Sequence, residues 1–133
     1  MRLFRRLAFA VYGLIEVGWG AWAYLAPRHF FDTFPGFGRV WTGAYPPFNG
    51  HLVSDLGATF LTLGVLLVIA AVLDDPRVSA VVVAGEVLFA ALHLLFHATH
   101  RGQMGADYPT SLVSLALGVV IPPLLLLAYR RRA

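Results

Sequence analysis

Three histidines and a glutamate lie in one apolar segment, "GEVLFAALHLLFHATHRG", and these residue types can do chemistry. The four residues are Glu86, His93, His97 and His100. In a helix that turns about 100° per residue, offsets of 7, 11 and 14 from the glutamate fall within a stripe about 60° wide. Imidazoles bind divalent metals and move protons near neutral pH. The spacing therefore predicts a chemically active face on one helix.

Two other apolar segments carry ionisable residues as well. His51 and Asp55 are i, i+4 neighbours, and Glu16 lies about midway along the first apolar segment. The candidate catalytic residues are therefore His51, Asp55, His93 and Glu16. His93 and His97 can bind one ion from a single helix face, and His51, Asp55 or Glu16 could complete a site of three or four ligands. The metal ligands that we expect are His51, His93 and His97. The alternative is that the acids are neutral and only bridge helices.

The chemistry stays open between two kinds of cofactor or substrate. A divalent metal would suit the histidines, and a histidine beside a carboxylate suits proton transfer to a quinone or lipid-like substrate. The chain has no cysteine, which excludes thiolate metal sites and cysteine nucleophiles. The patterns HExxH and GxSxG and the Walker motif are absent too. The sequence leaves open whether the protein is an enzyme.

The composition indicates that these polar residues lie in lipid. Of the 133 residues, 59% are hydrophobic and 13% are charged, whereas a soluble domain has about 45–50% and 25%. A charged side chain in a bilayer costs several kcal/mol, so it should face the protein interior. The net charge of +3 does not indicate nucleic acid, because lysine is absent and most arginines lie at the two ends.

Four segments are long and apolar enough to cross a bilayer as helices, at about 20 residues each. They are residues 7–25, 52–73, 78–98 and 111–129. The short connection Asp74-Asp75-Pro76 predicts a helical hairpin. We therefore expect an all-α, integral membrane, four-helix antiparallel bundle that forms a single domain over residues 1–133.

Arginine bias predicts the orientation. With four spans, seven arginines lie on the side of the chain termini and three on the other side. By the positive-inside rule both termini are cytoplasmic in a multi-pass protein of the cell membrane. An alternative is that "MRLFRR" and the following apolar run are a cleaved signal, although Glu16 fits that poorly.

The longest connection, residues 27–50, would then face outward, and it is rich in aromatic residues and proline. Loops of more than about 12–15 residues are often functional. Its aromatic rings could cover a site for a quinone or lipid, or form an aromatic belt at the headgroup level. The ends of three helices that carry polar residues lie at this same outer level of the membrane. We therefore expect one shared polar cavity that opens outward.

Three stretches, "LAPRHFFDTFPGFGRVW", "FNGHLVSDLGA" and "LHLLFHATH", resemble a group of short bacterial four-span membrane proteins that is broadly DoxX-like. The matching positions are Asp32, Asn49, His51, Asp55, His93 and His97. The group often has an acid where Gly50 stands and a proline where Leu92 stands. The resemblance implies the four-span fold and mildly favours quinone-coupled redox work.

Two function classes remain from the sequence. The first is a redox or acid–base enzyme or subunit that acts on a quinone or lipid-like substrate, with or without a metal. The second is a non-catalytic interaction subunit or small-molecule carrier. Expected partners are the lipid bilayer, a hydrophobic small molecule, and a membrane protein or a second copy of the chain.

Overall fold

Helices dominate the computed structural model, which describes residues 2–130. The α-helices are α1 (Arg2–Leu25), α2 (Pro27–Thr33), α3 (Gly50–Leu73), α4 (Pro76–Thr99) and α5 (Tyr108–Arg130). The short elements are β1 (Pro35–Gly36), β2 (Arg39–Val40), η1 (Thr42–Ala44) and η2 (Gly105–Asp107). The four long helices match the predicted apolar segments, and each begins a few residues earlier than predicted. Over the described residues, three segments are long and apolar enough to cross a membrane, namely α3, α4 and Gly105–Leu127.

Side-chain caps define where α3 and α4 begin. Asn49 caps α3 by accepting a hydrogen bond from the Leu52 amide, and Asp75 caps α4 by accepting from two amides. Pro76 follows at the first helical position, where its missing amide proton costs nothing. Asp74 ends α3 with a left-handed φ of 52°. The predicted tight connection is therefore confirmed.

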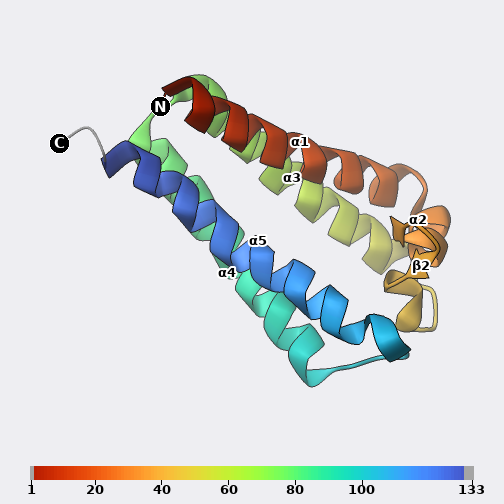
Figure 1. The fold of residues 1–133 in the computed structure, drawn as a ribbon. Helices are drawn as coiled ribbons and strands as arrows, with labels where there is room; N and C mark the ends of the chain where they lie inside the picture. The colour runs from red at the N-terminus through yellow and green to blue at the C-terminus, as the bar shows by residue number, and fades with distance from the viewer. Residues whose placement is uncertain (1, 131–133) are drawn as a thin grey trace.

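The long helices are arranged as two pairs (Figure 1). Helix α3 returns alongside α1, and α5 returns alongside α4. The two pairs lie close together at the end where α1 begins and α5 ends. They diverge toward the other end, where α2 and β2 lie.

Four glycines bring α1 and α3 into backbone contact. A Cβ on Gly13 would lie 2.7 Å from the Gly64 carbonyl oxygen, and a Cβ on Gly20 would lie 2.8 Å from the Gly57 carbonyl oxygen. On each helix the two glycines are seven residues apart, Gly13 and Gly20 on α1 and Gly57 and Gly64 on α3, which is about two helical turns. Gly18, by contrast, faces open space. Helices can approach this closely only where side chains are absent.

The segment between α1 and α3 folds onto the diverging end. Phe30 and Phe31 of α2 are buried against Ala23 and Val53. The strands β1 and β2 form a two-residue antiparallel ladder. At the tip between them, Phe37 is 99% exposed. The predicted loop is therefore a folded cover over the ends of α1 and α3.

The opposite end is closed by an arginine cluster, which we define as Arg2, Arg5, Asp74, Ser79 and Tyr129. The Asp74 carboxylate accepts hydrogen bonds from the Nε atoms of Arg2 and Arg5, both at 2.8 Å. The Arg5 guanidinium lies 3.7 Å from the centre of the Tyr129 ring, and the Tyr129 hydroxyl bonds to Asp74 and Ser79. Burial alone would raise the pKa of Asp74, but the arginine hydrogen bonds lower it below the ordinary value. The cluster ties α1, the α3–α4 connection and α5 together.

Candidate functional site

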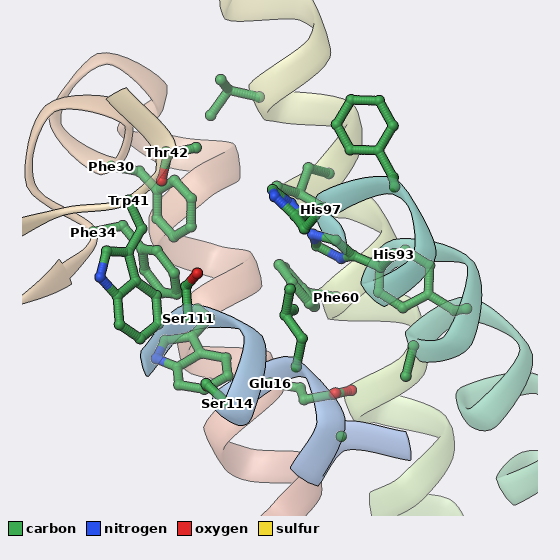
Figure 2. Close-up of a pocket in the computed structure, with 18 of the residues that line it drawn as sticks. Glu16, Phe30, Phe34, Trp41, Thr42, Phe60, His93, His97, Ser111 and Ser114 are labelled. Carbon is green, nitrogen blue, oxygen red and sulfur yellow. The ribbon is translucent and has the colours of Figure 1, made fainter. Parts of the chain in front are cut away.

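A cavity of about 630 Å³ lies between the two helix pairs at their diverging end. It reaches from the middle of α1 and α4 to the segment between α1 and α3 (Figure 2). Its lining is mainly apolar and aromatic. The residues with polar side-chain groups that line it are Tyr12, Glu16, Trp19, Trp41, Thr42, Tyr45, Asn49, Glu86, His93, His97, Ser111 and Ser114. A few polar groups in an apolar pocket of this size are typical of a small-molecule site.

The floor of the cavity holds two buried carboxyl groups. Glu16 of α1 and Glu86 of α4 are 4% and 2% exposed. Their side chains hydrogen bond to each other, and the Tyr12 hydroxyl bonds to Glu86. Two carboxyl groups can hydrogen bond to each other only when at least one of them is protonated, so that a proton lies between them. The Oε2 atoms of both glutamates have no hydrogen-bond partner among the described residues.

One wall carries the imidazole rings of His93 and His97, whose centres lie 4.7 Å apart. Figure 2 shows the two rings side by side on α4, with Glu16 deeper in the cavity. The Tyr45 hydroxyl lies 2.8 Å from His97 Nδ1 and donates to the His100 carbonyl oxygen at 2.7 Å. A hydroxyl has a single proton, so His97 Nδ1 must be the donor to Tyr45. Neutral His97 therefore keeps a free lone pair on Nε2.

The segment between α1 and α3 supplies the opposite wall. The rings of Phe30, Phe34 and Trp41 lie together there (Figure 2). The Trp41 Nε1 and Thr42 Oγ1 atoms are buried and have no hydrogen-bond partner among the described residues. Nothing in the sequence pattern indicated a role for Thr42. The hydroxyl sits in an irregular segment, where residue periodicity gives no orientation.

His51 and Asp55 do not line the cavity. Their side chains are 82% and 62% exposed on the outer face of α3, and they lie 3.4 Å from each other. The expected i, i+4 pair is therefore present, but it is separate from His93 and His97. The structure does not assemble the expected metal set of His51, His93 and His97. Among residues 2–130, no three His, Asp or Glu side chains form a group that could hold a metal ion.

The structure thus brings part of the expected site together. Glu16, Glu86, His93 and His97 share one cavity, as their depth in the helices predicted. Of the four candidate catalytic residues, Glu16 and His93 line the cavity, whereas His51 and Asp55 face outward. His100 is exposed at the end of α4, where its ring stacks on Phe96. Asp32 pairs with Arg28 on the surface of α2.

No family model, curated protein sequence or solved structure matches the chain. The DoxX-like resemblance therefore stays a prediction, and function must be argued from the cavity itself.

Proposed function

We propose that the chain crosses the cell membrane as an antiparallel four-helix bundle with both termini cytoplasmic, and that its cavity binds one hydrophobic small molecule. The apolar character of α3, α4 and α5 supports the membrane assignment. Helix α1 accompanies α3 over its length through the glycine contacts, which supports a fourth span. Large apolar side chains such as Leu14, Val65, Val81 and Leu88 point away from the protein, as lipid contact requires.

The unpartnered polar atoms of the cavity carry the proposal of a ligand. Glu16 Oε2, Glu86 Oε2, Trp41 Nε1 and Thr42 Oγ1 are buried, belong to residues that line one cavity, and lack hydrogen-bond partners among residues 2–130. Each unsatisfied buried polar group costs about 1–3 kcal/mol. A bound molecule with polar groups at both ends and an apolar body would satisfy them. A quinone or a lipid-like molecule has this character.

The chemistry that the cavity offers is proton exchange with the bound molecule. The glutamate pair shares a proton, and His93 and His97 lie on the adjoining wall. A histidine and a carboxyl group can act as general base and acid toward a ligand oxygen. The proposal requires no metal. It assigns Glu16, Glu86 and His93 to the cavity chemistry.

A second candidate is an interaction subunit, and the His51–Asp55 pair favours it. Polar residues on the outer face of a helix in a bilayer are costly unless they reach water or a protein partner. A membrane protein or a second copy of the chain that covered this face of α3 would provide such a partner. The two candidates use different surfaces and can be tested separately.

The first candidate is tested by titrating the purified protein with decyl-benzoquinone and using tryptophan fluorescence to monitor binding. Trp19 and Trp41 line the cavity, so a bound quinone should quench them. A Gly118→Leu change should weaken binding at least tenfold, because Gly118 lines the cavity and its Cβ position has room. Gly85→Leu is the matched control, since a Cβ there meets nothing within 4 Å. Absence of saturable quenching, or equal binding by both variants, would refute a cavity site for a quinone.

A further inference from the structure

The charges that face the cavity are unevenly distributed. No arginine is among the described residues that line it, and the chain has no lysine. The lining groups that can ionise are Tyr12, Glu16, Tyr45, Glu86, His93 and His97. The lining residues of α3 and α5 carry no titratable side chain. An anionic ligand would thus find no fixed positive charge, whereas a cation would find two carboxyl groups.

The glutamate pair at the floor is suited to exchange a proton for a cation. The pair holds a shared proton while it stands alone in an apolar pocket, because two adjacent carboxylates repel each other. An ammonium group placed between them would supply the positive charge that the proton now supplies. The unpartnered Oε2 atoms of Glu16 and Glu86 would then accept its hydrogen bonds.

A continuous series of ring contacts surrounds the space above the carboxyl pair. Phe34 contacts Trp19, Trp19 contacts Phe60, and Phe60 contacts Phe89, with centroid distances of 5.6, 6.3 and 5.7 Å. The series continues from Phe89 to His93 at 5.4 Å, to His97 at 4.7 Å and to Tyr45 at 4.9 Å. All of these residues line the cavity. Aromatic rings beside carboxylates are a favourable environment for organic cations.

The tautomer of His97 adds a preference for N–H donors. Because Tyr45 accepts from Nδ1, the Nε2 atom of neutral His97 can only accept a hydrogen bond. The unpartnered Trp41 Nε1 on the other wall can only donate. A ligand that fits both walls therefore has an N–H donor and an acceptor oxygen. A quaternary ammonium has no N–H to donate, either to Nε2 of His97 or to the unpartnered Oε2 atoms of the glutamates.

We infer that the molecule bound in this cavity is a hydrophobic primary or secondary amine, held as its cation by Glu16 and Glu86 and admitted in exchange for one proton. The inference rests on the proposed function, because it names the ligand class of the same cavity. In the exchange the shared proton leaves the carboxyl pair for water and the ammonium replaces it. The charge of the site is therefore unchanged, and no covalent bond forms or breaks apart from that to the proton.

The test compares two probes of equal shape, 4-phenylbutylamine and 4-phenylbutan-1-ol, by isothermal titration calorimetry of the detergent-solubilised protein at pH 7. The amine should bind at least tenfold more tightly than the alcohol. Titrations in two buffers with different ionisation enthalpies should show about one proton released for each amine bound. A Glu16→Gln/Glu86→Gln variant should bind the amine no more tightly than the alcohol, and saturable binding of either probe to this variant demonstrates an intact cavity.

A pH series on the unchanged protein tests the exchange without any substitution. A primary alkylamine stays protonated up to a pH of about 10, so only the protein titrates between pH 5 and pH 8. Amine affinity should rise with pH, by at most about tenfold per unit for one released proton. Affinity for the alcohol should rise less steeply or remain flat.

The outcomes separate the two proposals. If the alcohol binds as tightly as the amine, or the amine binds with no proton release, the amine inference is wrong and the cavity remains a site for neutral molecules. If an amine preference survives in the double glutamine variant, the carboxyl pair does not hold the cation and the inference is again wrong. If neither probe nor decyl-benzoquinone binds, the proposed function itself fails.

Discussion

The two ends of the helical assembly bury charged groups in opposite ways. In the arginine cluster, Asp74 meets two guanidinium groups and the Tyr129 hydroxyl. In the cavity, Glu16 and Glu86 meet each other, and each keeps an unpartnered oxygen. Opposite charges in contact stabilise the packing of the elements that carry them, whereas two adjacent buried carboxyl groups destabilise the fold. The contrast fits a structural role for the cluster and supports the proposal that the cavity binds a ligand.

Removing the acid of the arginine cluster should have the largest effect. In an Asp74→Ala variant the Arg5 guanidinium, 2% exposed, would lose its carboxylate partner. Loss of one partner of a buried ion pair costs about 3–5 kcal/mol. The cluster lies at the end of the molecule, close to water, so we expect the lower value. Unfolding in sodium dodecyl sulfate, followed by circular dichroism, measures the change.

The matched control for that variant is Asp32→Ala. Asp32 pairs with Arg28 at 2.7 Å, but both side chains are exposed. Exposed i, i+4 pairs contribute about 0.3–0.5 kcal/mol. Equal effects of the two substitutions would contradict a stabilising role for the arginine cluster.

The contribution of Asp74 should also depend on pH. The arginine hydrogen bonds hold the pKa of folded Asp74 below its ordinary value of 3.8. Its stabilisation is therefore complete above about pH 5 and is lost as the pH falls through the lowered pKa, below about pH 4. The difference in unfolding free energy between the wild type and Asp74→Asn should shrink over that range. A difference that stays constant down to pH 2 would exclude this ionisation as its source.

Removing the buried carboxyl groups of the cavity should not lower the unfolding free energy, in contrast to removing Asp74. A Glu16→Leu/Glu86→Leu variant removes both carboxyl groups together with their unpartnered oxygens. Replacing a buried polar pair by apolar groups of similar shape is about neutral or stabilising. We expect stability to be unchanged or to rise by about 1 kcal/mol in the same unfolding assay. A loss of more than 2 kcal/mol would make the pair structural and remove the contrast between the two ends.

A modest loss of stability is expected where Tyr45 contacts His97 at the wide end of the cavity. Tyr45→Phe removes the hydroxyl between His97 and the His100 carbonyl oxygen, with a cost of about 1 kcal/mol. Nitrogen NMR of labelled histidine should show His97 losing its preference for a proton on Nδ1. In the unchanged protein, burial and the neighbouring Tyr108 raise the pKa of Tyr45. Ultraviolet titration should place Tyr45 above the ordinary value for tyrosine, and an unshifted value would argue against the buried contact.

Hydropathy and helical spacing predicted much of this arrangement. Runs of about 20 apolar residues gave the four long helices, and the offsets on α4 placed Glu86, His93 and His97 on one face. The expectation of a polar cavity toward one end agrees with the position of Glu16 and the histidines. These features depend on local periodicity and on depth along a helix, and both can be read from a sequence.

The rotation of α3 could not be read in the same way. The pattern of polar residues on this helix suggested that His51 and Asp55 faced inward. Instead, Gly57 and Gly64 face α1, and Asp55 lies about 180° around the helix from Gly64. Glycines seven residues apart in both partner helices were a signal for this contact. This signal is informative only once the two distant segments are known to pack together, and neither segment alone shows that. The same holds for the arginine cluster.

The glycine contacts between α1 and α3 have a mechanical consequence. Backbones that interlock at two levels cannot slide or turn past each other without collision, so α1 and α3 must move as one rigid body. A change in the width of the cavity between the helix pairs then has to come from α4 and α5 tilting relative to that body. The arginine cluster would act as the pivot, since it fastens all three parts at the narrow end. A ligand would then enter between the two helix pairs or through the end where they diverge, as the pairs hinge apart.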